Sequence, residues 1–264
     1  SQFRTHFSTK SECDLTEFES LSQNLQILQP DVVINCAAFT QVDAAEHYPK
    51  QAAAVNTQGV ENLVKVAHEL GFSIVHFSTD YVFNGKQTTP YTETDPTNAL
   101  SVYGQTKLDG EKALFKATTP HCCIRTSWLF SPFGKNFVKT IHQKLMHRKA
   151  LQVVNDQYAR PTSGIDLARI VVELLQNNIL MTHSLYHFTN SGVASWFGLA
   201  RYIAKKLDSS TPITAIPTSS LQNIAPRPKY SVLANERIEK LGNFSSQSWE
   251  EALEECFKIL EEIH

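Results

Sequence analysis

Tyr103 and Lys107 carry the most chemical information in this sequence. They stand four residues apart in 101–114, a stretch that is predicted to be a helix, so both side chains project from one face of it. A tyrosine has a pKa of about 10, and an adjacent ammonium lowers that pKa because it favours the phenolate. The pair is therefore suited to protonating an oxygen while a carbonyl group is reduced. The same spacing also arises by chance on amphipathic helices, where the lysine is only solvated.

A predicted strand upstream of this helix ends in hydroxyl-bearing side chains. Residues 72–83 are rich in β-branched and aromatic types, which is typical of a buried strand, and Ser78, Thr79 and Asp80 stand near its end. In open parallel α/β sheets the ligand crevice lies at the carboxyl ends of the strands. We therefore expect Thr79, and secondarily Ser78, to donate a hydrogen bond to a reacting oxygen. The alternative is a buried hydroxyl bonded to backbone.

Several longer stretches narrow this interpretation. They occupy residues 35–43, 78–83, 125–129, 136–140 and 156–162. In residues, order and spacing they resemble the dTDP-4-dehydrorhamnose reductases, which are extended members of the short-chain dehydrogenase/reductase superfamily. The resemblance covers nearly the whole chain, and a set of co-linear motifs is more specific than any single one.

The resemblance implies an α/β fold, a doubly wound parallel sheet of the Rossmann type with a smaller, discontinuous substrate-binding lobe. Residues 1–128 and 155–184 would form the dinucleotide-binding domain, and residues 129–154 and 185–264 the nucleotide-sugar-binding lobe. The implied activity is NADPH- or NADH-dependent reduction of the C4 ketone of dTDP-4-dehydro-6-deoxy-L-mannose to dTDP-L-rhamnose, for cell-surface polysaccharide. The cofactor passes hydride, and the protein supplies the proton.

The resemblance also implies a role for each candidate residue. Tyr103 gives its proton to the developing alkoxide, Lys107 lowers the Tyr103 pKa and binds the nicotinamide ribose, and Thr79 stabilises the same oxygen. The expected cofactor-binding residues are Thr9, Lys10, Asp14, Leu15, Ala37, Ala38, Phe39, Thr40, Phe77, Tyr103 and Lys107. The expected substrate-binding residues are Thr79, Asp80, Tyr81, Trp128 and Arg227.

Residue chemistry adds to some of these roles and leaves others open. The Trp128 indole offers a flat apolar face to a sugar ring, and the Arg227 guanidinium matches diphosphate oxygens, although both also fit structural roles. Small residues such as Ala37 allow close approach of a cofactor or close packing of strand on helix. Lys10 stands where an NAD-binding protein carries an acidic residue, which favours NADPH. Asp14 is also a candidate N-cap of the next helix.

The N-terminal region departs from the family pattern. No glycine precedes Gly59, so the glycine-rich turn that binds the cofactor pyrophosphate is not in this sequence. Residues 3–7 are predicted to be the family's second strand. We expect that a piece of about one strand and one helix, roughly 25 to 30 residues, belongs before them.

Composition excludes several other classes of function. The net charge of −2 gives no electrostatic footprint for nucleic acid, and no apolar run is long enough to span a membrane. Five cysteines without C-x-x-C spacing favour a reducing compartment, here the cytoplasm, and Cys122 and Cys123 are predicted to pack on opposite sides of a strand. The ten histidines are scattered, so no metal site is predicted. A homodimer is the expected assembly.

Helix and strand patterns alternate through the first two-thirds of the chain, as in a parallel doubly wound sheet. Strands are predicted at 3–7, 32–36, 73–78, 122–127, 151–154 and 185–188. Helices are predicted at 21–29, 44–67 (broken near Tyr48 and Pro49, closed by Gly71), 102–116, 137–147, 164–176, 195–207 and 248–263. Four prolines between 212 and 228 predict a loop-rich section.

Two other functions on the same fold stay open. A non-catalytic regulatory protein, like the β subunit of methionine adenosyltransferase, resembles this sequence around 80–83 and 103–112, but residues 125–128 and 156–157 favour the reductase. A nucleotide-sugar dehydratase or epimerase is the other. A dehydratase is expected to carry a glutamate after Asp80, where this sequence has Tyr81.

Overall fold

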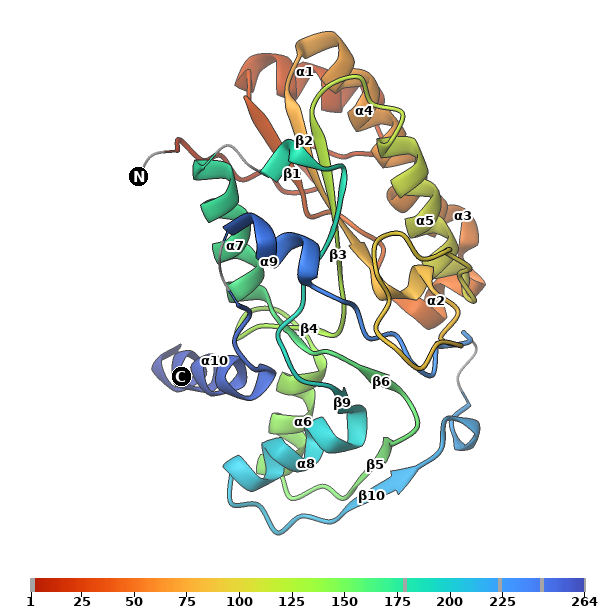
Figure 1. Ribbon diagram of the computed structural model, residues 1–264, viewed down its shortest axis with the longest axis vertical. Helices are drawn as coiled ribbons and strands as arrows, with labels where there is room; N and C mark the ends of the chain where they lie inside the picture. Colours follow the sequence, from red (N-terminus) through yellow and green to blue (C-terminus); the bar gives the residue numbers. More distant parts are fainter. Residues whose placement is uncertain (1–2, 178–179, 223–224, 243–244, 264) are drawn as a thin grey trace.

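The centre of the structure is a parallel sheet of four strands. The computed structural model describes residues 3–177, 180–222, 225–242 and 245–263. The strand order is β1 (Val32–Asn35), β2 (Ser73–Thr79), β3 (His121–Thr126) and β8 (Leu185–His187) (Figure 1). All the pairings between these strands are parallel. The predicted α/β class with a parallel sheet is therefore confirmed.

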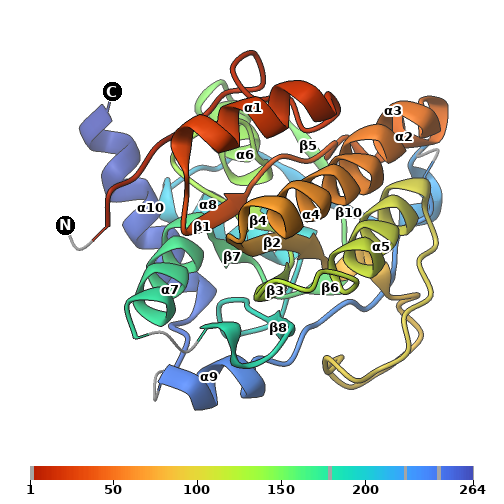
Figure 2. The ribbon, with the colours of Figure 1, turned by 90° about the horizontal axis from the view of Figure 1, so that it is seen from above.

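Helices cover both faces of this sheet, as a doubly wound fold requires (Figure 2). One face packs against α1 (Phe18–Leu28), α4 (Gly59–Leu70) and α5 (Val102–Leu114). The other face packs against α7 (Gly164–Gln176) and α9 (Glu236–Gly242). Because strand side chains alternate, Cys123 joins the first apolar cluster and Cys122 the second. The predicted packing role of the two cysteines is confirmed.

The chain between β1 and β2 forms one interrupted helical segment. The helix α2 (Val42–His47) ends just before Pro49, which begins α3 (Pro49–Ala53) as the sequence predicts. A π-helical turn, Ala54–Gln58, then leads into α4. Gly71 ends α4 with a φ of 83°, a left-handed conformation that glycine adopts without strain. The break and the C-cap were both encoded locally.

A third apolar cluster forms a smaller lobe beside the sheet, below it in Figure 1. Its elements are α6 (Phe137–Met146), β5 (Leu151–Val154), α8 (Trp196–Lys206), β10 (Ile213–Ile216) and α10 (Trp249–Ile263). The strands β5 and β10 pair in parallel. Two further two-residue pairings join β4 (Leu129–Phe130) to β7 (Thr162–Ser163), and β6 (Tyr158–Ala159) to β9 (Ala194–Ser195).

The division of the chain into a cofactor domain and a sugar lobe stays a prediction, but one boundary moves. The sequence assigns 185–264 to the lobe, whereas β8 pairs with β3 and α9 packs on the sheet. Both elements therefore belong to the central sheet layer. Strand pairing, which joins residues far apart in the chain, decides this placement.

The structure corrects three local predictions. Residues 3–7 form no strand, and Phe7 is 87% exposed. A strand needs a neighbour for its backbone hydrogen bonds, and within the described residues the sheet ends at β1. Asp14 is not the N-cap of α1: that position is Glu17, and Asp14 Oδ1 instead accepts from Thr16 N at 2.9 Å in the preceding turn. The loop-rich section contains β10, because β5 provides it with a partner.

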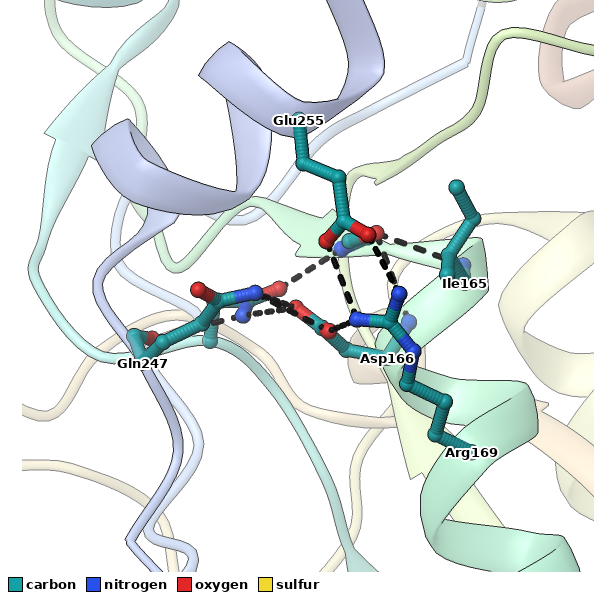
Figure 3. A network of polar contacts seen from close by, with 7 residues as sticks. Ile165, Asp166, Arg169, Gln247 and Glu255 are labelled. Atoms are coloured by element: carbon teal, nitrogen blue, oxygen red, sulfur yellow. Dashed lines mark hydrogen bonds and ion pairs between the residues drawn. The ribbon is translucent and has the colours of Figure 1, made fainter. Parts of the chain in front are cut away.

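Polar contacts between α7 and α10 attach the lobe to the sheet layer (Figure 3). Asp166 accepts two hydrogen bonds from Gln247 Nε2, at 2.8 and 3.0 Å. Arg169, also on α7, pairs with Glu255 of α10 and lies 3.3 Å from Asp166. The helix α7 packs on the sheet and α10 packs in the lobe, so these contacts hold the lobe in a defined position relative to the sheet.

Candidate active site

The candidate site lies where the parallel strands β1, β2 and β3 end. Their carboxyl ends share one edge of the sheet. Gly104 of α5 brings this helix close to that edge, and Gly110 brings it close to the π-helical turn Ala54–Gln58. A Cβ on Gly104 would lie 2.3 Å from the carbonyl oxygen of Tyr81, and one on Gly110 would lie 2.1 Å from that of Asn56. Only glycine permits both approaches, so these two positions place Tyr103 and Lys107 beside the strand ends.

Lys107 is buried against β2. Its Nζ donates to the carbonyl oxygen of Phe77 at 2.6 Å and lies 3.3 Å from His76 Nε2. The side chain is 2% exposed, and this burial lowers the pKa of Lys107 to about 8. The amine is therefore close to changing its charge at neutral pH.

Tyr103 is a weaker acid than the sequence predicts. Burial raises the pKa of Tyr103 to about 12, while a hydrogen bond with Thr79 lowers it and the charge of Asp80 raises it. The net lowering of this pKa that was expected from Lys107 is therefore not found. The Lys107 amine is bonded to Phe77 and His76, and the loss of hydration around the phenol outweighs other influences. The structure nevertheless brings Thr79 and Tyr103 together.

Thr79 is the last residue of β2, and its hydroxyl makes hydrogen bonds with the residues that follow. Its Oγ1 donates to Asp80 Oδ1 at 3.1 Å and accepts from Tyr81 N at 3.2 Å, where it caps the short 3-10 turn Asp80–Val82. The alternative of a backbone-bonded hydroxyl therefore holds alongside the predicted role. Ser78 Oγ is buried with no hydrogen-bond partner in the described part of the chain. Such a group can receive a ligand atom.

Asp80 is a buried acid with a raised pKa. Its carboxyl is 2% exposed, and burial raises the pKa of Asp80 to about 7, although Ser231 and Thr79 oppose this by donating hydrogen bonds. Ser231 Oγ lies 2.5 Å from Asp80 Oδ2. Both carboxyl oxygens thus have partners within the protein, and Asp80 joins the segment around Ser231 to the end of β2.

The loop after β1 contains the expected cofactor residues Ala37, Ala38, Phe39 and Thr40. Asn56, on the π-helical turn, holds this loop: Oδ1 accepts from Phe39 N at 2.8 Å and Nδ2 donates to Phe39 O at 3.1 Å. The same Nδ2 lies 3.1 Å from Thr106 Oγ1 on α5. Asn56, which the sequence interpretation missed, therefore links the loop to the helix of Tyr103. A polar residue on an apolar helix face was its only signal.

The N-terminal cofactor candidates form a separate turn. Thr9 donates to Glu12 through N and Oγ1, at 2.7 and 2.8 Å, and Lys10 lies 3.6 Å from Asp14. Leu15 packs against α4, where Asn62 Nδ2 donates to its carbonyl at 2.9 Å. Thr9, Lys10, Asp14 and Leu15 thus share one segment, whose contacts run within its own turn and to α4. Their cofactor roles stay predictions.

Trp128 lies at the end of β3 with a φ of 46°, an unusual value for a large side chain. Its ring stacks on Trp196 with centroids 3.5 Å apart and an angle of 11° between planes. Trp196 Nε1 donates to Gln157 Oε1 at 3.1 Å. Trp196 thus covers one face of the indole, and a sugar-stacking role for Trp128 stays a prediction. Trp196 was missed because the two tryptophans meet only in the tertiary structure.

Arg227 is held by an acidic residue from the other end of the chain. Its guanidinium donates to Asp43 at 2.7 and 3.1 Å and to the carbonyl of Ala225 at 3.0 Å. Arg227 also lowers the pKa of Tyr81, although burial raises that pKa more. The segment around Arg227 is therefore fastened over the turn that follows β2. A diphosphate role for Arg227 stays a prediction.

In the ranges that the structure describes, no group of three or more histidine, cysteine, aspartate or glutamate side chains is arranged to hold a metal ion. No helix in those ranges has the length and apolar character needed to cross a membrane.

The fold and the site together define a class. A Rossmann-like parallel sheet, a strand-end threonine and a Tyr-x-x-x-Lys helix are the features of short-chain dehydrogenases/reductases. Within that class, the chain belongs to the RmlD substrate binding domain family, which it matches over residues 1–262. The resemblance inferred from the sequence is confirmed.

Individual relatives agree with this assignment. The spore coat polysaccharide biosynthesis protein SpsK of Bacillus subtilis is 37% identical over 94% of this chain and 86% of its own length. The dTDP-4-dehydrorhamnose reductase of Salmonella typhimurium is 37% identical over 90% of this chain and 82% of its own. The crystal structure of dTDP-4-dehydrorhamnose reductase from Bacillus anthracis in complex with NADP has a TM-score of 0.91 at 32% identity, covering 95% of this chain and 88% of that one.

More distant structures share the fold alone. A dTDP-glucose 4,6-dehydratase from Streptomyces venezuelae is 17% identical, with a TM-score of 0.81, over 94% of this chain and 78% of that one. A UDP-glucose 4-epimerase from Thermotoga maritima is 14% identical, with a TM-score of 0.80, over 94% of this chain and 83% of that one. Because the relatives at 32% to 37% identity include dTDP-4-dehydrorhamnose reductases, the dehydratase, epimerase and regulatory-subunit alternatives are not favoured.

Proposed function

We propose that this protein reduces the C4 ketone of dTDP-4-dehydro-6-deoxy-L-mannose to give dTDP-L-rhamnose, with NADPH or NADH as the reductant. The observation that carries the proposal is the meeting of Thr79 and Tyr103 at the carboxyl edge of the sheet, one helical turn from the buried Lys107. Membership of the RmlD substrate binding domain family supports the substrate class.

The raised pKa of Tyr103 suits an acid in this reaction. A phenol can give a proton only while it is protonated, and a pKa of about 12 keeps Tyr103 protonated at neutral pH. An alkoxide is a much stronger base than a phenolate, so the transfer from Tyr103 to the developing alcohol oxygen is downhill. The Thr79 hydroxyl turns its one hydrogen from Asp80 to the same oxygen and stabilises the charge there. Lys107, once protonated, stabilises the phenolate that is left.

A nicotinamide cofactor fits the residues at this edge. Ala37 is exposed and Ala38 is half-buried, so the backbone after β1 is open to a flat ligand, and Ser78 has an unused buried hydroxyl. When bound, the cofactor supplies the hydride. We assign its binding to the loop from Ala37 to Thr40, to Phe77 and Lys107, and, at the adenosine end, to the turn that contains Lys10 and Asp14.

The sugar site is proposed on the lobe side of the same edge. The free face of Trp128 stacks on the sugar ring, because an apolar indole face matches the C–H face of a pyranose. Tyr81 and Asp80 border the reacting carbon beside Thr79. Arg227 binds the diphosphate once the ligand competes with Asp43 for its guanidinium.

The cellular compartment, the kind of partner and the assembly of the protein are part of the same proposal. All five cysteines are free, which supports a reducing compartment such as the cytoplasm. The net charge of −2 supports a small-molecule substrate over a nucleic acid partner. A homodimer is the proposed assembly, and sedimentation equilibrium tests it.

The test of the function is turnover of the dTDP-ketosugar with NADPH, followed at the nicotinamide absorbance. Tyr103→Phe is expected to lower kcat by about 10² to 10⁴-fold, the usual contribution of a general acid, while NADPH binding changes little. Tyr202→Phe, whose hydroxyl bonds Glu254 on the lobe, is the matched control and keeps wild-type turnover. A Tyr103→Phe protein that reduces the sugar at the wild-type rate contradicts the acid assignment.

A further inference from the structure

Asn35, His76 and Lys107 form a continuous chain of hydrogen bonds behind the catalytic pair. Ala37 N donates to Asn35 Oδ1 at 3.0 Å, and Asn35 Nδ2 lies 3.0 Å from His76 Nδ1. His76 Nε2 in turn lies 3.3 Å from Lys107 Nζ, which also donates to the carbonyl of Phe77. The three linked side chains are at most 5% exposed, so bulk water does not substitute for these contacts.

The backbone N–H of Ala37 sets the direction of this chain. An N–H group only donates, so the oxygen of the Asn35 amide faces Ala37 and the NH₂ faces the imidazole. The NH₂ also only donates, so His76 Nδ1 accepts. Burial lowers the pKa of His76, so the ring is neutral and carries its one hydrogen on Nε2.

That hydrogen points at the amine of Lys107. An uncharged amine has a lone pair and can accept it, whereas an ammonium has three hydrogens and no acceptor. The contact is therefore a hydrogen bond with the neutral lysine and a clash of donors with the charged one. The carbonyl of Phe77 can accept from either form, so it does not discriminate between them.

We propose that His76 is a positioning residue for Lys107: held by Asn35 with its hydrogen on Nε2, it donates to the Lys107 amine and favours the uncharged form in the cofactor-free protein. Only the catalytic consequence rests on the proposed function. Because Lys107 must be charged beside the Tyr103 phenolate, the donor from His76 sets how readily the lysine takes up its proton during the cycle.

Other groups around Lys107 also shift its pKa. Burial lowers the pKa of Lys107, whereas Glu111, one turn further along α5, and Cys123 on β3 both raise it. Tyr103 lies one turn earlier on α5, and Asp80 follows β2. Within the described residues, His76 is the side chain that lies within hydrogen-bond distance of Nζ. Replacing it therefore removes one discrete contact and leaves the nearby charges in place.

The experiment measures the ionisation of Lys107 directly, by NMR of protein labelled with ¹³C at the lysine Cε, over a pH titration without cofactor. The Lys107→Met variant identifies the resonance by its loss. His76→Phe keeps a buried ring but has no donor, and it is expected to raise the pKa of Lys107 by about one unit, as for the loss of one hydrogen bond. His187→Phe, which also replaces a buried histidine of the sheet, is the matched control and leaves Lys107 unchanged.

Asn35→Asp provides a second test through the imidazole. The carboxylate still accepts from Ala37, but its other oxygen holds a hydrogen on His76 Nδ1, which turns Nε2 into an acceptor that favours the ammonium. The pKa of Lys107 is then expected to rise by about two units, because a donor is exchanged for an acceptor. In the double variant Asn35→Asp/His76→Phe, the shift is expected to fall back towards that of His76→Phe alone.

The pKa measurements test the His76 contact independently of enzyme turnover. A Lys107 pKa that stays within about 0.3 units of wild type in both His76→Phe and Asn35→Asp overturns the proposal. So does an equal shift in His187→Phe, or shifts that simply add in the double variant, since addition would indicate charge alone. If the shifts occur but the wild-type protein does not reduce the dTDP-ketosugar, the His76 contact stands and the proposed function fails.

Discussion

Replacing Gly104 by alanine tests whether the close approach of α5 positions Tyr103. A Cβ at this position would lie 2.3 Å from the carbonyl oxygen of Tyr81, and ordinary contact begins at 3.4 Å. The helix and the turn must therefore separate by 1.1 Å, the difference between these two distances. Neither neighbour is a flexible side-chain end, so backbone has to move. Tyr103 is adjacent in the chain and moves with it.

A displacement of about 1 Å at a catalytic group costs roughly 10²-fold in rate. We therefore expect Gly104→Ala to lower kcat for the dTDP-ketosugar by about 10²-fold, more than it raises KM. Overpacking costs about 1 to 3 kcal/mol of unfolding free energy, of which the higher helix propensity of alanine offsets up to about 1 kcal/mol. The protein should stay folded, with a modestly lower melting temperature.

Gly164→Ala is the matched control for this experiment. Gly164 is also helical, but a Cβ there would meet its nearest neighbour at 3.5 Å, an ordinary contact. Its kcat and melting temperature should equal those of wild type. If Gly104→Ala is folded by circular dichroism and turns over as fast as Gly164→Ala, the close approach does not position the acid, and the reasoning is refuted.

Three further predictions concern the cofactor, the sugar and an acid. The 264-residue chain is expected to bind NADPH more weakly than micromolar, because it contains no glycine-rich turn before a helix; calorimetry that finds tighter binding contradicts this. Trp128→Ala should weaken dTDP-sugar binding and leave NADPH affinity unchanged; a large fall in melting temperature with equal loss of both would indicate a core role instead, worth about 3 to 5 kcal/mol. For Asp80, a folded-state pKa of about 7 against 3.8 unfolded means that the folded state keeps a proton that the unfolded state loses, so its contribution to stability falls as pH rises between these values. Urea unfolding of Asp80→Asn at pH 5 and pH 8 should show a smaller pH dependence than wild type, and equal slopes would contradict the assignment.

Local patterns in the sequence predicted most of the secondary structure. The helix α7 and the strand β5 have their predicted bounds, and Ser195 caps α8 as expected. Gly71 ends α4 because a left-handed residue is needed there. These features depend on residues within a few positions of one another, so the order of residue types is sufficient to predict them. The set of co-linear motifs, to which the helix of Tyr103 and Lys107 belongs, was sufficient for the class of protein.

Electrostatics and long-range contacts required the tertiary structure. The spacing of Tyr103 and Lys107 predicted a lowered phenol pKa, but the folded chain turns the amine towards His76 and buries the phenol, so the pKa rises. The stacking of Trp128 on Trp196 also could not be predicted from the sequence, because residues 68 positions apart meet only after the lobe has formed.

Residue types and the alternation of strand and helix patterns, which can be seen in the sequence alone, were enough to predict which side chains could do chemistry and at which edge of the sheet they would gather. How strongly each group holds its proton, and which polar partners it meets, became visible in the folded chain. The physical reason is that burial and hydrogen bonding arise from segments distant in the chain, as when β2 sets His76 against Lys107 of α5.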